Sequence, residues 1–222
     1  MIINLEKLFE EAQGKRNNNQ IPEAIEDYQK VRDEAQNLGN RELSAESLHM
    51  IGVAYYQDKK YPQAEEMLDK AQKEFEEMGN NLLVGAIQRD RGLIAFEEKS
   101  LEKAQDFLRE SIQTLEKIGN LGHLGVSQVK LGVVEAARGD TLEGETTIMR
   151  GIDNISQSPD KFFLATGYFD LAKVQKQTGK IDEARKSWEK SLEILNQISG
   201  QNEFKSRREE ITKFIKNLES NP

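Results

Sequence analysis

The sequence predicts an all-α fold, and two observations support this prediction. Charged residues make up 32% of the chain, apolar residues only 36%, and there are just 4 prolines. Such a composition favours amphipathic, solvent-exposed helices over sheets. The sequence also repeats every forty residues, which indicates a stack of similar units rather than one globular core.

The forty-residue period divides the chain into five units. The tripeptides LGN, MGN and IGN occupy positions 38–40, 78–80 and 118–120, and degenerate copies follow at 158–160 and 199–200. Small residues recur in two more columns, Ala12, Gly52, Gly92, Gly132 and Ala172, and then Ala24, Ala64, Ala104, Gly144 and Ala184. Because independent columns agree, we expect a single solenoid domain over 1–222, with repeats at about 1–39, 40–79, 80–119, 120–159 and 160–199.

Each unit is expected to form two helices, since apolar residues recur at three- and four-residue spacing in both of its halves. In the first two units, Pro22 and Pro62 predict the start of the second helix, because proline fits the first helical turn. The second, fourth and fifth units should break between their helices at 58–61, 138–140 and 178–180. At the unit junctions, glycine can end one helix and the following Asn can cap the next.

The small columns predict close packing between the two helices of a unit. Large residues at 28, 68, 108, 148 and 188 should fill the space one turn further on. The first unit is degenerate, with Glu11, Ala12 and Lys15 where the second unit has Ile51, Gly52 and Tyr55. The fourth has Gly144 and Gly151 inside a helix, and each glycine costs about 1 kcal/mol relative to alanine. We therefore expect the fourth unit to be the softest.

The last predicted element is an eleventh helix at 203–219. Its apolar residues are Phe204, Ile211, Phe214, Ile215 and Leu218, and its other positions are mostly charged or polar. Terminal units of solenoids need a polar outer face. We therefore expect this helix to cap the second helix of the fifth unit, at 181–198.

The repeated columns resemble the tetratricopeptide repeat, most closely over residues 48–71, which read LHMIGVAYYQDKKYPQAEEMLDKA. The resemblance covers about 200 residues and implies a right-handed α-solenoid of five helix pairs plus the capping helix. The usual unit has about 34 residues. A forty-residue unit is similar to the long-helix subclass found in kinesin light chains and in bacterial peptide-sensing regulators.

The resemblance also implies that the first helices line a concave surface. By register, their inward positions form an apolar middle with charged edges, and an exposed apolar patch usually marks an interaction site. We expect the partner-binding groove to contain His49, Val53, Tyr56, Arg89, Leu93, Phe96, Lys130, Val133, Phe169, Lys173 and Lys176. The alternative is that some of these side chains pack between neighbouring first helices.

Two binding modes known in the family lack their residues here. A carboxylate clamp needs Lys and Asn at the inward positions of successive first helices, and those positions hold Phe9, Gln13 and Met50. An asparagine ladder needs inward Asn residues, and Asn17 is the only one. Recognition should therefore depend on the partner's side chains.

Composition argues against several other functions. With no cysteine and only two histidines, His49 and His123, we expect no metal site based on thiolate or histidine ligands. The net charge of −8 argues against binding to nucleic acid or to anionic membranes. The sequence contains no run of 18 apolar residues, the length that would predict a membrane helix. Acidic residues lie near its start, where a targeting peptide needs basic residues. We therefore expect a cytoplasmic protein.

No nucleophile motif or phosphate-binding loop is present, so we expect neither an enzyme nor a cofactor. The favoured function is a non-enzymatic adaptor whose concave groove holds a peptide or helix of a partner protein. The alternative is a bacterial-type peptide-sensing or regulatory module that acts through a separate effector. Self-association through the convex face or one end is a third hypothesis.

Overall fold

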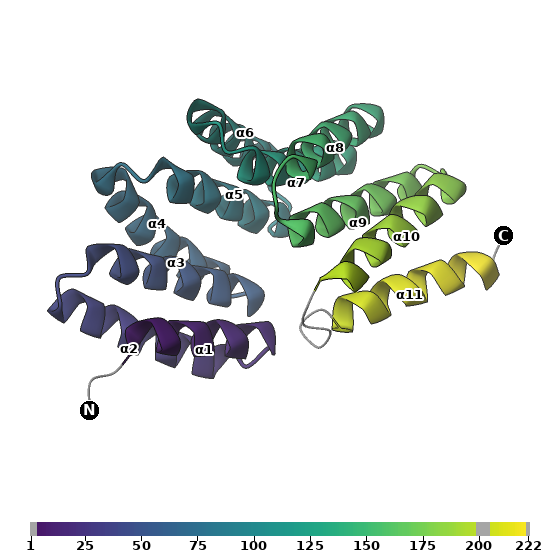
Figure 1. Cartoon of the computed structure of the whole chain (residues 1–222). Coiled ribbons are helices and arrows are strands. Elements are labelled where there is room, and N and C mark those ends of the chain that lie inside the picture. Colours follow the sequence, from purple (N-terminus) through teal and green to yellow (C-terminus); the bar gives the residue numbers. More distant parts are fainter. Residues whose placement is uncertain (1–3, 199–204, 221–222) are drawn as a thin grey trace. The chain divides into compact units, whose positions relative to one another are not determined.

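The computed structural model describes residues 4–198 and 205–220, and within them every regular element is an α-helix. Eleven helices form five consecutive pairs and a final single helix, as the sequence predicts (Figure 1). Their bounds are α1 (Leu5–Asn17), α2 (Ile21–Asn37), α3 (Arg41–Gln57), α4 (Tyr61–Met78), α5 (Asn81–Glu97), α6 (Leu101–Ile118), α7 (Leu121–Arg138), α8 (Thr141–Ser156), α9 (Lys161–Gln177), α10 (Ile181–Gln197) and α11 (Lys205–Ser220).

The helices belong to two compact units. The first unit extends to Ile94 and the second begins at Ala95, so the division falls inside α5. Apolar clusters fill each unit, and the large residues predicted to fill the space between paired helices all lie in these cores. They are Tyr28, Leu68, Leu108, Ile148 and Trp188, each with 0% of its surface exposed.

The helix ends follow the predicted columns. Gly39, Gly79 and Gly119 have φ between +68° and +72°, the left-handed conformation that ends a helix. The asparagine after each of them caps the next helix through its side chain: Asn40 Oδ1 accepts from the Leu43 amide at 3.1 Å, and Asn120 Oδ1 from the His123 amide at 3.0 Å. Proline lies in the first turn of α2 and of α4. The breaks between paired helices are also where the sequence places them.

A second left-handed column lies between the two helices of each pair. It contains Asn19, Lys59, Lys99, Gly139 and Gly179, forty residues apart, all with positive φ. Glycine and asparagine tolerate this conformation, whereas a lysine adopts it at a cost in conformational energy. The turn geometry is therefore kept in every pair even where the residue type does not favour it.

The pair α7 and α8 shows why small residues occupy the packing columns. A Cβ atom added to Gly132 would lie 2.4 Å from the Gly144 carbonyl oxygen, and one added to Gly151 would lie 2.5 Å from the Gly125 carbonyl oxygen. Real Cβ atoms do not approach other atoms so closely, so the two backbones are in direct contact. The expectation that this unit is softest considered only helix propensity. The close packing that these glycines permit acts against that cost, and the relative stability of this unit stays a prediction.

The final helix α11 covers the end of the second compact unit, which begins at Ala95. The Phe214 ring stacks on Trp188 of α10, with centroids 5.0 Å apart, and Ile211 is fully buried. Phe214 also packs on Phe169 of α9, with ring centroids 6.2 Å apart. The sequence named only α10 as the neighbour of this helix. Two of the predicted apolar residues, Phe204 and Leu218, lie outside the described side chains.

The contact between α7 and α8 predicts opposite effects for two glycine substitutions. Gly144→Ala should lower the free energy of unfolding by about 1–3 kcal/mol, because the new methyl group collides with the backbone of α7. Gly14→Ala in α1 should raise it by about 0.5–1 kcal/mol, because no atom lies within 4 Å of the new Cβ. Chemical denaturation of both variants tests this; equal effects would contradict the backbone contact.

The stacking of α11 on α10 predicts that Phe214→Ala destabilises the second compact unit. We expect a loss of about 3 kcal/mol, at the lower end of the range for phenylalanine because the ring is only half-buried. Lys213→Ala, on the exposed side of the same helix, should change stability by less than about 0.5 kcal/mol. If Phe214→Ala unfolds like the unmodified chain, α11 does not act as a cap.

Candidate functional site

In the first compact unit, which ends at Ile94, the expected groove residues lie on one face of α3 and on α5. His49 is 5% exposed, whereas Val53, Tyr56 and Leu93 are half-buried. Tyr56 packs against Tyr61, with ring centroids 6.2 Å apart. The apolar side chains of this face are thus partly covered and retain some accessible surface.

A compact charged cluster joins the first helices α3 and α5. His49 Nε2 lies 2.8 Å from Asp90 Oδ2, and the Arg89 side chain donates two hydrogen bonds to Asp90 Oδ1, at 3.2 Å from Nε and 3.0 Å from Nη2. Burial alone would raise the pKa of Asp90, but the Arg89 charge and the His49 hydrogen bond outweigh it and hold the pKa at about 2. Asp90 is therefore ionised at neutral pH and holds the two helices together.

The second unit contains a similar ion pair between first helices. Lys130 Nζ on α7 lies 2.6 Å from Asp170 Oδ2 on α9, forty residues away. Val133 on α7 and Phe96 at the end of α5 are half-buried, and Lys99 Nζ lies 5.7 Å from the Phe96 ring centroid. The inner charge of Lys130 is thus already paired within the chain.

The three expected groove residues on α9 differ in accessibility. Phe169 is only 3% exposed, because it packs against α11 and lies in the apolar core. Lys173 and Lys176 are exposed, and each places its ammonium group over aromatic rings: Lys173 over Phe169, and Lys176 over Trp188 and Phe214. Neither lysine forms an ion pair with a described residue, so both are accessible to an acidic ligand.

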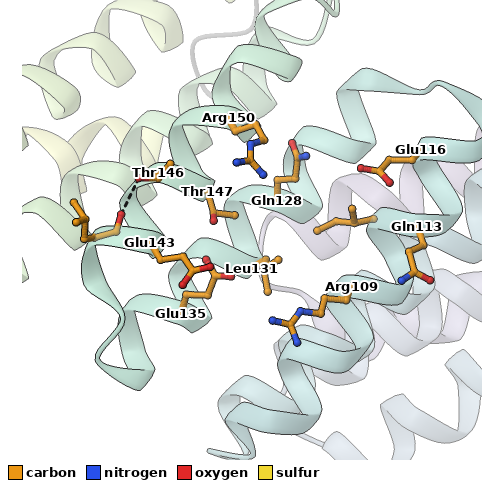
Figure 2. A pocket seen from close by; sticks show the side chains of 12 residues that line it. Arg109, Gln113, Glu116, Gln128, Leu131, Glu135, Glu143, Thr146, Thr147 and Arg150 are labelled. Carbon is orange, nitrogen blue, oxygen red and sulfur yellow. Dashed lines mark hydrogen bonds between the residues drawn. The ribbon is translucent and has the colours of Figure 1, made fainter.

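A pocket that the sequence did not predict lies between α6 and α8, on the face of α7 away from Lys130 and Val133. We call it the outer pocket; its volume is about 590 Å³ (Figure 2). It is lined by Arg109, Ile112, Gln113 and Glu116 of α6, Gln128, Leu131 and Glu135 of α7, and Leu142, Glu143, Thr146, Thr147 and Arg150 of α8. The one feature of the sequence that could have indicated this pocket is Glu135, an acid at a core position between Val134 and Ala136.

The described part of the chain contains neither a cluster of metal ligands nor a helix suited to a membrane. No group of three or more His, Cys, Asp or Glu side chains there could hold a metal ion. None of its helices combines the length and the apolar character needed to span a membrane.

Two segments of the chain match family models described as tetratricopeptide repeat, at residues 12–77 and 165–194. No curated protein has a significantly similar sequence.

Several solved structures share the fold at low sequence identity. NprR in complex with its cognate peptide NprX matches with a TM-score of 0.80 at 12% identity, over 98% of this chain and 62% of that chain. Aspartyl phosphate phosphatase F from Bacillus subtilis matches with a TM-score of 0.73 at 13% identity, over 99% and 61%. A Rap protein complexed with competence and sporulation factor matches with a TM-score of 0.68 at 13% identity, over 98% and 67%. This chain thus spans less than two thirds of the first two proteins.

The cluster around Asp90 predicts a specific pH dependence of stability. The carboxyl pKa falls from 3.8 to about 2 on folding, so the cluster stabilises the fold above about pH 4, and this contribution is lost as the pH falls toward 2. Asp90→Asn should therefore cost about 2 kcal/mol at neutral pH and progressively less below pH 4.

Thermal melting from pH 2 to pH 7 measures this difference, with Asp33→Asn on the exposed surface as the control. A constant difference between Asp90→Asn and the unmodified chain across that range would show that the carboxylate charge is not the cause.

Proposed function

We propose that this chain, which is a tetratricopeptide-repeat protein, is a non-enzymatic interaction module that holds a peptide or helix of a partner protein against the inner faces of its first helices. The observation that supports this most directly is the pairing and the partial burial of the inner residues within each compact unit. Their central charges are paired between neighbouring first helices, as in His49 with Asp90 and Lys130 with Asp170. Apolar side chains beside them remain only half-buried.

The apolar residues supply the contact surface in this proposal. Val53 and Leu93 in the first unit, and Val133 in the second, are large enough to anchor a partner side chain and are partly accessible. Binding energy in such interfaces concentrates in a few apolar anchors surrounded by polar groups. Fixed ion pairs next to the anchors add little affinity of their own and favour partners whose charges match.

The exposed lysines on α9 indicate the partner's charge. Lys173 and Lys176 have accessible ammonium groups without a carboxylate from the described residues. We therefore infer that the partner segment is acidic where it meets α9. Replacing either lysine with glutamate should weaken binding more at low than at high ionic strength, because salt screens exposed charges.

A second candidate is a peptide-sensing module that acts through a separate effector. The likeness to NprR bound to its cognate peptide, and to a Rap protein complexed with competence and sporulation factor, favours this version of the proposal. A small free peptide that alters the spacing of the helix pairs would support sensing, whereas a stable complex with a folded protein would support an adaptor. Catalysis is no part of either version, and hydrolysis of an aspartyl phosphate by this chain would contradict both.

The proposal predicts that Leu93→Glu abolishes binding. Peptides selected from a phage-displayed library on the unmodified chain should bind this variant at least about 10-fold more weakly, because a charge replaces a central anchor. Leu38→Glu, at a site that is 68% exposed at the end of α2, should leave affinity unchanged.

Thermal melting of the same variants separates binding from folding. A half-buried Leu93 predicts a modest fall in melting temperature for Leu93→Glu, whereas a drop of many degrees would mean that this side chain packs between helices. A folded Leu93→Glu variant with full affinity would exclude the inner face as the binding surface.

A further inference from the structure

The outer pocket contains a buried carboxylate that forms no ion pair with a described residue. Glu135 is only 5% exposed, and its Oε2 atom accepts no hydrogen bond from any described residue. Thr147 lies within hydrogen-bonding reach of the carboxyl group, and the Arg109 charge acts on it without forming an ion pair. In Figure 2 the carboxylates of Glu135 and Glu143 are drawn near one another at one side of the pocket. A buried charge without a partner is costly, so the site is poised to accept a cation.

The equivalent cluster forty residues further along, formed by Gln175, Lys180 and Glu145, shows how this chain satisfies a buried carboxylate. Forty residues beyond Glu135 is Gln175, whose Nε2 donates to Glu145 Oε1 at 3.2 Å. Lys180 Nζ donates to the other oxygen of Glu145 at 2.5 Å. A lysine ammonium thus neutralises the single carboxylate of that site.

The fourth repeat lacks this lysine. The position equivalent to Lys180 is Asp140, an anion. The position equivalent to Glu145 is Gln105, which accepts a hydrogen bond from Arg138. Glu145 therefore has an ammonium partner from this chain, whereas Glu135 forms no ion pair with a described residue.

We propose that the outer pocket receives the arginine or lysine side chain of a partner protein's surface segment, and that the cationic head of this side chain pairs with Glu135. Leu131, Ile112 and Leu142 line the pocket and can cover the apolar stem of such a side chain. This site lies on a different face of α7 from the groove residues and is independent of the proposed function.

The rim of the pocket indicates a protein segment rather than a free ion. Arg109 and Arg150 line the pocket without an ion pair to a described residue, and they suit acidic side chains next to the inserted cation. Leu142 and Met149 are 74% and 57% exposed along the same side of α8, so apolar surface continues beyond the pocket. A metal ion is disfavoured, because the described residues offer no group of three ligands.

The electrostatics of the unliganded site favour the same interpretation. Burial raises the pKa of Glu135, and the neighbouring Glu143 and Asp140 raise it further, against the opposing effects of Thr147 and Arg109. A carboxyl group with a raised pKa destabilises the folded state as the pH rises above its ordinary range. Glu135→Gln should therefore be at least as stable as the unmodified chain at neutral pH.

The proposal is tested by NMR titration of the isotope-labelled full chain with N-acetylarginine methylamide. We expect saturable shifts confined to amides of α6, α7 and α8 around the pocket, with a dissociation constant on the order of 1 mM for so small a probe. N-acetylcitrulline methylamide has nearly the same shape but no charge, and it should bind at least about 10-fold more weakly. Glu135→Gln should lose the arginine response, while its melting temperature stays the same or rises.

Glu46→Gln is the matched control, because burial also raises the pKa of Glu46, which lies in the other unit. It should keep the arginine response, as should Leu93→Glu if it folds. The proposal is overturned if the citrulline probe binds equally well, if Glu135→Gln responds like the unmodified chain, or if the shifts lie outside the pocket. A concentration-dependent dimer that Glu135→Gln abolishes would instead assign the pocket to a second copy of this chain and refute a separate partner.

Discussion

The distance between the two helices of each pair is the constraint on which the rest of the structure depends. Alanine or glycine columns set this distance, and in α7 and α8 they allow the backbones to touch. Once the helices are so close, one large side chain per pair, such as Tyr28 or Trp188, fills the remaining space completely. The inner and outer faces of each first helix follow from this packing, because the face turned to the second helix is fixed.

Most of the fold could be predicted from the sequence because its determinants are local. Gly39, Asn40 and Pro22 act within a single turn of chain, so their positions in the repeat give the helix bounds directly. The softness of the fourth unit stays a prediction, because glycine propensity is a property of one helix, whereas the contact that Gly132 and Gly144 permit is made between two.

The candidate site was less predictable, because side-chain pairing depends on residues in another repeat. Register places Arg89 and Lys130 on the inner face with Asp90 and Asp170 nearby, but it does not reveal the direct bonds between them. Phe169 lies in the core because α11 turns back over α9 as well as α10. Glu135 was missed because its significance appears only when its surroundings are compared with those of Gln175.

Lys130 and Asp170 occupy the same position in the fourth and fifth repeats, and the bond between them links these two repeats. In that column the successive residues are Asp90, Lys130 and Asp170, so the sign of the charge alternates along the chain. If a copy of the fifth repeat replaced the fourth, a carboxylate would stand where Lys130 now meets Asp170, and like charges at that distance repel. The repeats are therefore not interchangeable modules. This single contact therefore favours the present order of the fourth and fifth repeats.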